Sequence, residues 1–375
     1  MSDESSQPSI DPVVAVLCPV APEPQLLARL ASAGLRPVPL AGLSDSSEQD
    51  RLLVEVAGLA CDAALLVLPA AVGLDGGSAA VWLRLAEARL PRAVLVTDLG
   101  PDTADIEEFA AIATRALEEE VIVPTLPVLD DGEQSVASMN LLTLQISTPD
   151  GSHTGDADHL AATVAARTNA TDAILVVTED DHLAESALAG LAPAPDRLAR
   201  SLRRSVRAGE LVPVLPDTPD DGAIADLAGW WSRLAFDPAR LMAIGVAGES
   251  AAFRSGEHTL HSVILQVDGP LATARALFGR PRTGSAFLTM PGVNAAGPHP
   301  DRAWPTWLEV SGGDDQTGAA EAPGDPEGQG AAEAELAHAS VGELEPDGTF
   351  VATLPLRSRP GEALCIGDEP IWLVP

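Results

Sequence analysis

The segment Asp62-Ala-Ala-Leu-Leu-Val-Leu68 decides the fold class, because six apolar residues follow one another after a single acid. A strand with one face in water alternates apolar and polar residues, whereas an unbroken apolar run is typical of a strand buried on both faces of a parallel sheet. Arg92-Ala-Val-Leu-Val-Thr97 and Val13-Val-Ala-Val-Leu-Cys18 have the same character. The three runs predict the centre of a parallel β-sheet.

Helical stretches alternate with these runs along the chain. We expect helices over residues 24–33, 48–60, 77–88 and 102–120, and a further strand over 37–40. Strands that alternate with helices in this way predict an α/β fold with a doubly wound sheet.

The middle of the chain has a different texture, which predicts a small α+β insert over residues 126–206. Its expected elements are two strands and two helices, over 136–147, 173–178, 158–167 and 196–209. The first pattern then resumes with a strand over 211–215 and a helix over 222–234. The α/β domain is therefore expected to comprise residues 12–125 and 207–237.

The last third of the chain consists of short β-rich runs separated by Gly and Pro, which predicts a β-barrel domain over residues 238–375. Its expected strands are 261–267, 272–277, 285–289, 307–310 and 349–354. Residues 311–338 are rich in Gly, Ala, Glu, Asp and Pro, and residues 1–11 are polar and acidic at their start. Such segments bury too little apolar surface to fold, so we expect both to be disordered.

Composition excludes several classes of protein. The net charge of −33, from 55 acids against 22 bases, argues against a nucleic-acid binder, because docking on phosphates needs basic residues. The arginines between 197 and 207 are then interpreted as one solvated helix face. No apolar run reaches the roughly 20 residues of a membrane span. With an acidic start and three distant cysteines, we expect a cytoplasmic protein with reduced thiols, bound to neither DNA nor membrane.

Three segments resemble translation elongation factor G. The first, Cys61-Asp-Ala-Ala-Leu-Leu-Val-Leu-Pro-Ala-Ala-Val-Gly73, continues through Ala80-Val-Trp82 to Leu90-Pro-Arg-Ala-Val-Leu-Val96, and is similar to the strand, helix and strand before that family's NKxD motif. Residues 196–215, ending Arg207-Ala-Gly-Glu-Leu-Val-Pro-Val-Leu215, resemble the end of the family's insert and its return strand. Leu356-Arg-Ser-Arg-Pro-Gly-Glu-Ala-Leu-Cys365 resembles the close of its second domain.

The resemblance covers roughly residues 12–310 and 340–375. It implies a P-loop-GTPase-like sheet with a small α+β insert, followed by a β-barrel like the family's second domain. The family's other three domains have no counterpart in this sequence. By the same resemblance, the partner would be the ribosomal stalk or a translation factor.

The residues that would bind nucleotide depart from the family's pattern, beginning with the loop after residues 13–18. Cys18 and Glu23 stand where the family has glycines, Pro24 replaces its Lys and Gln25 its Ser/Thr. Such a loop holds phosphates through backbone N–H groups and the Lys, and a proline has no N–H. The Glu23 carboxylate would repel a triphosphate by about 4 kcal/mol for unit charges 4 Å apart at an effective dielectric near 20.

The family's other nucleotide motifs are altered as well. Its DTPGH falls on residues 43–47, where Leu43 replaces the Asp on the magnesium side, Ser46 the Gly at the γ-phosphate and Ser47 the His that orients water. The first switch segment is missing, because little chain separates 24–33 from 37–40.

The two motifs that contact the base are also changed. NKxD becomes Thr97-Asp98-Leu99-Gly100, so Gly100 replaces the acid that reads guanine, and the Ser-Ala pair behind the base becomes Thr218-Pro219. The altered loops together predict that neither GTP, GDP nor Mg²⁺ is bound in the family's manner. We therefore expect no catalytic, cofactor or metal site.

Other polar and aromatic groups have simpler interpretations. His182 and Glu185 have the spacing of a helical metal pair, but an exposed polar helix start accounts for them better. The histidines at 258 and 261 are interpreted as surface residues. Cys18 is interpreted as a buried residue at a strand end. Trp230 and Trp231 are interpreted as a packing anchor between sheet and barrel, and barrel packing is likewise favoured for the tryptophans at 304 and 307.

The leading hypothesis is an elongation factor G-like pseudo-GTPase with a non-catalytic, protein-binding or regulatory role linked to translation. A divergent but active translational GTPase that binds GTP and GDP is the alternative. A third hypothesis is a remnant that stabilises a full-length paralogue by associating with it. The apolar strands remain regular while the nucleotide loops are altered, which favours use of the surface over the pocket.

Overall fold

The computed structural model describes residues 11–19, 22–41, 54, 57–58, 60–100, 105–117, 119–130, 134–191, 193–232 and 234, and the strand backbones beyond residue 241. The chain divides into two compact units, residues 1–240 and 241–375. The segments predicted to be disordered lie outside the described residues, apart from Asp11. Of the helix expected over 48–60, only residues 54, 57, 58 and 60 are described, and they are helical.

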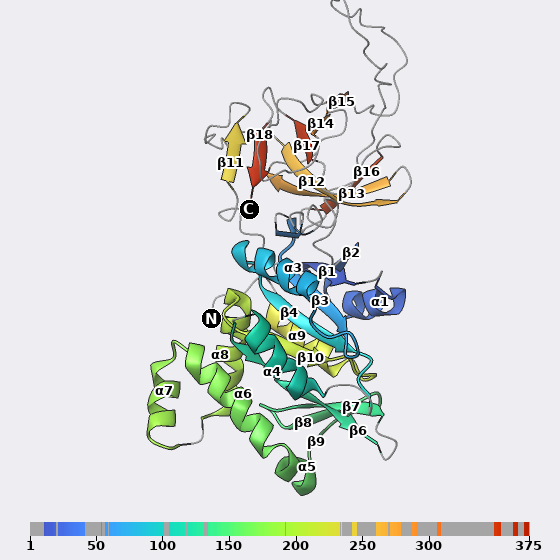
Figure 1. The fold of residues 1–375 in the computed structure, drawn as a ribbon. Helices are drawn as coiled ribbons and strands as arrows, with labels where there is room; N and C mark the ends of the chain where they lie inside the picture. The colour runs from blue at the N-terminus through green and yellow to red at the C-terminus, as the bar shows by residue number, and fades with distance from the viewer. Residues whose placement is uncertain are drawn as a thin grey trace, which may run out of the picture. The chain divides into compact units, whose positions relative to one another are not determined.

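A parallel sheet of six strands forms the centre of the first unit (Figure 1). Its order is β2-β1-β3-β4-β10-β5, and every neighbouring pair is parallel. The strands are β1 (Val13–Cys18), β2 (Arg36–Ala41), β3 (Ala63–Pro69), β4 (Arg92–Thr97), β5 (Val121–Ile122) and β10 (Val212–Pro216). Every residue of β1 is buried, as are the first six of β3. The predicted parallel sheet and α/β fold are confirmed.

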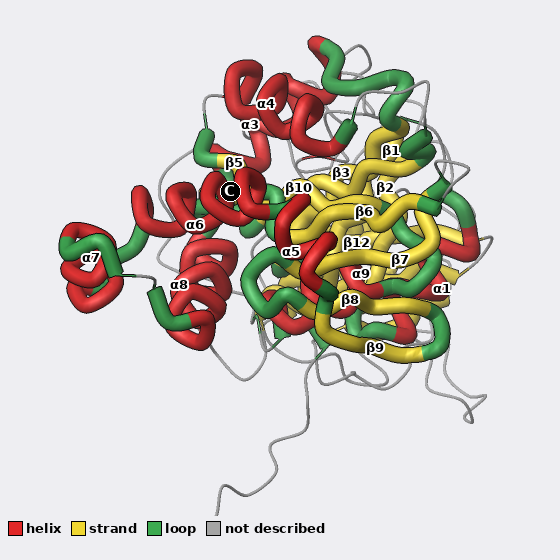
Figure 2. The backbone as a smooth tube through the Cα atoms, turned by 90° about the horizontal axis from the view of Figure 1, so that it is seen from below, coloured by secondary structure: helices red, strands yellow, loops and turns green. Residues whose placement is uncertain are grey.

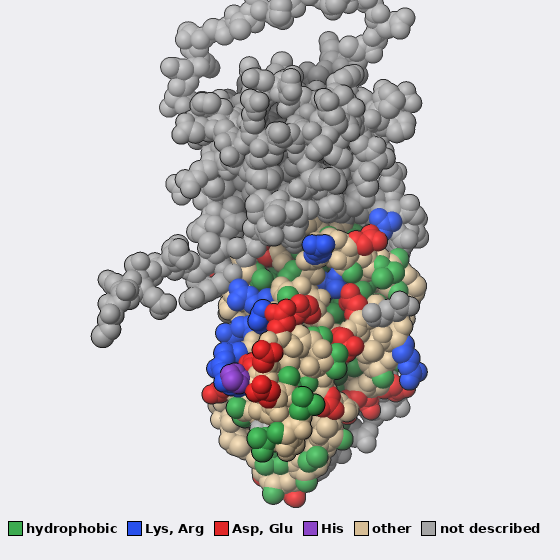
Figure 3. Space-filling model, turned by 90° about the vertical axis from the view of Figure 1, so that its left-hand side faces the viewer, with side chains coloured by type: hydrophobic (Ala, Val, Ile, Leu, Met, Phe, Trp, Pro, Cys, Tyr) green, Lys and Arg blue, Asp and Glu red, His purple; other side chains and the backbone are tan. Residues whose placement is uncertain are grey.

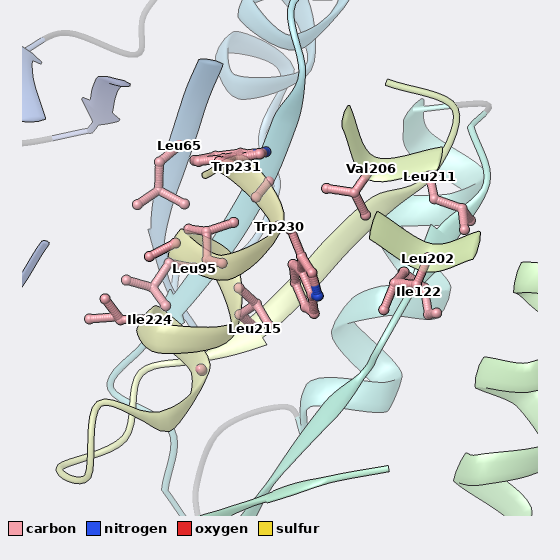
Figure 4. Close-up of a cluster of buried hydrophobic side chains, with 14 of the residues drawn as sticks. Leu65, Leu95, Ile122, Leu202, Val206, Leu211, Leu215, Ile224, Trp230 and Trp231 are labelled. Carbon is pink, nitrogen blue, oxygen red and sulfur yellow. The ribbon is translucent and has the colours of Figure 1, made fainter. Parts of the chain in front are cut away.

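Helices cover both faces of this sheet. The helices α1 (Pro24–Ser32) and α9 (Gly222–Trp231) lie on one face, and α3 (Gly76–Glu87) and α4 (Ile106–Leu117) lie on the other (Figure 2). In the core, Trp231 lies beside Leu65 of β3, and Trp230 points toward Leu202 (Figure 4). Both tryptophans are buried in the core of the first unit. Their role as an anchor between sheet and barrel stays a prediction.

The insert joins an antiparallel sheet to four helices. The sheet has the order β6-β7-β8-β9 and consists of β6 (Thr125–Leu129), β7 (Ser135–Asn140), β8 (Gln145–Thr148) and β9 (Gly151–Thr154). The helices are α5 (Ala157–Ala162), α6 (Val164–Val177), α7 (Asp181–Leu188) and α8 (Pro195–Ala208). The predicted α+β character is present.

The strand predicted over 173–178 is wrong, because residues 173–177 are the last turns of α6. Ala166, Ala170 and Ile174 are buried on one face at a spacing of four residues, which is helical. A short apolar run such as Ala-Ile-Leu-Val-Val fits a buried helix as well as a strand. The helix expected over 158–167 is also interrupted, since Thr163 separates α5 from α6.

The second unit is described by its strand backbones and by the buried side chains of Ala274 and Arg275. They form an antiparallel sheet of order β15-β14-β17-β12-β13-β16 and a separate pair, β11-β18. The five strands expected here are confirmed at β12 (Leu260–Asp268), β13 (Leu271–Phe278), β14 (Phe287–Met290), β15 (Thr306–Leu308) and β16 (Thr349–Thr353). The remaining strands are β11 (Met242–Gly245), β17 (Ala363–Ile366) and β18 (Ile371–Val374).

Two carboxylates, one just before α9 and one in its middle, fasten the insert to the sheet domain. One oxygen of Asp220 accepts hydrogen bonds from the Ser138 hydroxyl of β7 at 3.1 Å and from the Gly222 amide at 2.8 Å. Asp226 accepts from the Asn140 side chain at 2.7 Å and the Thr125 hydroxyl at 3.2 Å. Burial raises the pKa of the Asp226 carboxyl, although both hydrogen bonds oppose the shift.

Gly222 is required by this junction, because a Cβ there would lie 2.3 Å from the Ser138 hydroxyl oxygen and 3.0 Å from the Ser147 Cβ. We expect Gly222→Ala to lower the free energy of unfolding by about 1–3 kcal/mol in urea denaturation, as overpacked sites do. Gly229 of the same helix faces open space, so Gly229→Ala should raise stability by about 0.5–1 kcal/mol. Equal stability of the Gly222→Ala variant and the wild type would contradict this account.

The buried Asp226 carboxyl predicts a pH dependence. A raised native pKa means that the folded state holds this proton more tightly than the unfolded state does. The unfolding free energy of the wild type should therefore fall relative to Asp226→Asn as pH rises above about 4, by about 1.4 kcal/mol for each unit of the shift. Denaturation of both proteins from pH 4 to 8 measures the difference. The exposed Asp172, replaced by Asn, serves as the control, and a constant Asp226→Asn difference would refute the prediction.

Candidate functional site

The carboxyl edge of the parallel sheet is the place where such a fold binds ligands. From β1 the chain passes through α1 to β2 on one side, whereas from β3 it passes through α3 to β4 on the other. The strand order thus reverses between β1 and β3. In open α/β sheets, ligands bind beyond the carboxyl ends of the strands at such a switch point. The candidate site is therefore the edge formed by Cys18, Ala70, Thr97 and Asp217.

The loop after β1 presents no reactive or cationic side chain to this edge among its described residues. Cys18 is buried, and burial raises the pKa of its thiol to about 12, which keeps it neutral and unreactive. Glu23, Pro24 and Gln25 are exposed. Glu23 precedes α1 as its N-cap without a side-chain capping hydrogen bond, and Pro24 is the first helical residue. The charge beside this helix start is therefore negative.

The loops after β4 and β10 meet at the edge, which brings together Thr97, Asp98 and Thr218. The Asp217 amide donates to the Val96 carbonyl at 2.9 Å. Asp98 is exposed with a left-handed backbone (φ 56°), and its carboxylate accepts from the Thr97 hydroxyl at 3.2 Å.

The remaining predicted positions lie in different environments. Thr218 is buried and donates to Asp220 at 2.7 Å, whereas Pro219 is exposed. A Cβ at Gly100 would meet nothing within 4 Å, so the space next to its backbone is open. The positions Leu43, Ser46 and Ser47 lie outside the described residues.

An arginine that sequence reasoning missed links the two sides of the site. The Arg29 guanidinium of α1 lies 2.8 Å from the Asp217 carboxylate, donates to the Asp221 carboxylate, and donates to the Thr218 carbonyl at 2.9 Å. The Arg29 and Asp217 side chains are each 22 % exposed. We call Arg29, Asp217, Asp221 and the Thr218 carbonyl the Arg29 cluster. It fastens the helix after β1 to the loop after β10.

The charges of this cluster are strongly coupled. Burial disfavours the charge of Arg29, but the hydrogen bond to Asp221 and the charge of Asp217 outweigh it, so its pKa is raised. Burial raises the pKa of Asp217, Arg29 opposes this, and the nearby Asp221 and Asp98 add to the rise. One guanidinium thus contacts two carboxylates, and the carboxylate of Asp98 lies near one of them, Asp217. This edge of the sheet repels anions and has no free cation of its own among the described residues.

Metal binding finds no support in the part of the chain that the structure describes, where no group of three or more His, Cys, Asp or Glu side chains could hold an ion. His182 and Glu185 lie 3.8 Å apart at the start of α7 and are 74 % and 75 % exposed. They form the exposed polar helix start that the sequence predicted. Among the described residues, no helix is long and apolar enough to cross a membrane.

Comparison with known proteins adds the fold and nothing more specific. No protein-family model matches the chain, and no curated protein does. A crystal structure of a protein from Thermus thermophilus, whose description names no function, superposes with a TM-score of 0.56 at 17 % identity. The match covers 96 % of this chain and 55 % of that protein, so this chain spans about half of its length. The fold class is therefore α/β, with a parallel six-stranded sheet and separate antiparallel sheets.

The Arg29 cluster predicts a measurable loss of stability when its cation is removed. Arg29→Met would leave Asp217, Asp221 and the Thr218 carbonyl without their shared donor, and we expect about 1–3 kcal/mol lower stability in urea denaturation. Arg115→Met, at an exposed position of α4, should change it by less than about 0.5 kcal/mol. Adding Asp217→Asn to Arg29→Met should restore part of the loss, because the two positions are coupled. Equal losses in the Arg29 and Arg115 variants would contradict the role assigned to the cluster.

Proposed function

We propose that the chain is an elongation factor G-like pseudo-GTPase with a non-catalytic, protein-binding role linked to translation. The observation that carries the proposal is the Arg29 cluster. It joins α1 to the loop after β10, which aligns with the family's Ser-Ala motif, and Asp98 of the loop that aligns with NKxD lies near its Asp217. Its two carboxylates outnumber its one cation. A nucleotide at this edge would have to bring its phosphates toward Glu23 and its base toward the Arg29 cluster.

The arrangement of elements supports the same proposal at the level of the fold. A parallel sheet with helices on both faces, an α+β insert before its return strand β10, and an antiparallel second unit follow the order that the resemblance implies. We accordingly propose a P-loop-GTPase-like sheet for the first unit and a domain-II-like β-barrel for the second. The proposed setting is the cytoplasm.

The proposed partners are proteins, with the ribosomal stalk or a translation factor first. The proposal includes no bound GTP, GDP or Mg²⁺, and neither DNA nor membrane as a partner. A maintained core with an altered pocket supports this choice: β1, β3, β4 and β10 are buried almost throughout, although the loops at their ends have lost the family's residues. Most random changes in a core destabilise a protein, so an intact core beside an altered pocket indicates that the folded surface is the part in use.

Nucleotide binding separates this proposal from an active GTPase. We expect titration of the full chain with GDP, and with GTP plus Mg²⁺, to give no saturable heat up to millimolar nucleotide in calorimetry. An intact elongation factor G measured in the same buffer is the positive control. A dissociation constant in the micromolar range for either nucleotide would establish the alternative and overturn the pseudo-GTPase assignment.

Partner binding is tested separately by sedimentation with purified ribosomes, with ribosomes stripped of their stalk, and with elongation factor G. Association that needs the stalk or the factor supports the translation link. The absence of any association with all three would refute that link. Hetero-association with a full-length paralogue alone would support the remnant hypothesis in its place.

A further inference from the structure

The helix α8 carries an unusual concentration of positive charge. Five of the chain's 22 basic residues lie within its 14 residues: Arg197, Arg200, Arg203, Arg204 and Arg207. Its other side is buried through Leu198, Leu202 and Val206. Basic side chains gather along one side of the described surface (Figure 3). Against a net charge of −33, this helix is a local basic island.

Only part of this charge is neutralised by neighbours. Arg197 lies 3.3 Å from the Asp180 carboxylate, and Arg204 pairs with Glu179. Arg200 and Arg203 are exposed and make no ion pair with any described residue. Unpaired arginines on one helix face can each take a carboxylate in a two-point hydrogen bond, which a Lys cannot do.

A cavity of about 140 Å³ lies beside these arginines. It is lined by the end of α6, the residues between α6 and α7, and the middle of α8, including Thr178, Ser201, Arg200 and Arg204. Its lining also contains the carboxylates of Glu179, Asp180 and Glu210. Two of these carboxylates are already paired, Asp180 with Arg197 and Glu179 with Arg204. Arg200 is therefore the arginine of the lining that has no ion pair with a described residue and can bind a partner's carboxylate.

The neighbouring helices expose large apolar side chains. Leu188 at the end of α7 is 90 % exposed, Leu191 beyond it 63 %, and Val176 near the end of α6 68 %. Single exposed apolar residues are ordinary, but three on the elements around a basic helix give the combination of apolar anchors and arginines found at protein interfaces. A nucleic acid would make no use of these side chains.

We propose that the α7–α8 face, defined by Val176, Leu188, Leu191, Arg200 and Arg203, binds an acidic, amphipathic segment of a partner protein. Its carboxylates pair with Arg200 and Arg203, and its apolar side chains cover Val176 and the two leucines. This rests on the proposed protein-binding function and names the surface and the chemistry of the partner. It also replaces the interpretation of these arginines as a merely solvated face.

The test uses the full chain and synthetic probes in fluorescence anisotropy. The first probe is an 18-residue helical peptide with Glu on one face and Leu on the other. The second replaces every Glu by Gln, and the third is a single-stranded RNA of matched charge. We expect saturable binding of the first probe, at least tenfold weaker binding of the second and third, and an affinity that falls with added salt.

Variants assign the binding to this face. The double change Arg200→Glu with Arg203→Glu should weaken the acidic peptide at least tenfold, and Leu188→Ser at least threefold. Arg115→Glu, a charge reversal at an exposed position of α4, should leave its affinity within twofold. Because Arg200, Arg203 and Leu188 are exposed, the melting temperature should not change, which separates lost binding from lost folding.

The outcomes are distinct from those of the proposed function. No saturable binding of the acidic peptide, equal effects of the Arg200/Arg203 and Arg115 variants, or tighter binding of the RNA would each overturn the proposed surface. The proposed surface would also be overturned if the Arg200/Arg203 variant still associated in full with ribosomes or factors. The translation role would stand in that case. Arginine-dependent peptide binding without any association with ribosomes or factors would keep the surface and remove the translation role.

Discussion

Burial of a parallel sheet on both faces is the constraint on which the first unit depends. β1, β3, β4 and β10 have almost no polar residues between their ends, so a sheet made of them is stable only when helices cover both sides. α1 and α9 supply one cover, and α3 and α4 supply the other. Polar chemistry is thereby confined to the loops at the two edges of the sheet, and any site for a small ligand has to be built there.

The Arg29 cluster shows what occupies the carboxyl edge in this chain. An ion pair between partly exposed groups contributes little by itself, but Arg29 contacts two carboxylates and a carbonyl, and it connects the helix after β1 with the loop after β10. Both segments lie at the carboxyl edge of the sheet, where open α/β sheets bind ligands. Here a side chain from within the protein makes the connection, and the carboxylates around it make the edge unfavourable for phosphate.

The sequence predicted those strands and helices whose apolar residues follow a regular local pattern. The buried strands were evident because their apolar runs are unbroken, and α1, α3 and α8 because their apolar residues recur with helical spacing. The end of α6 was misassigned because Ala-Ile-Leu-Val-Val fits a strand equally well. β9 gave no signal, since Gly151, Ser152, His153 and Thr154 are all exposed and polar. Its pairing with β8 is set by the turn between them, which apolar periodicity does not report.

The sequence predicted where the candidate site lies, but it did not predict that Arg29 forms part of it. The altered loops could be located because they follow recognisable strands, whereas Arg29 is 192 residues from Asp221 in sequence and looks like any polar position of an amphipathic helix. The acid-rich turn Asp217-Thr-Pro-Asp-Asp221 was the one available signal, because three acids directly after a buried strand need a cation or a donor nearby. The tertiary fold decides which cation pairs with these acids, so the sequence alone did not identify Arg29.

Charge is distributed in a way that links the pocket to the surface. The sheet's carboxyl edge is acidic around Arg29, while the unpaired cations lie on α8, whose buried side packs near Trp230 of α9. α9 begins at the same acid-rich turn that holds Arg29 and, through Asp220 and Asp226, also holds the insert sheet. The helix α9 therefore contacts the carboxyl edge of the parallel sheet, the insert sheet and the basic helix α8. A partner that docks on α8 would contact a helix that packs against α9, and α9 begins at the carboxyl edge of the sheet.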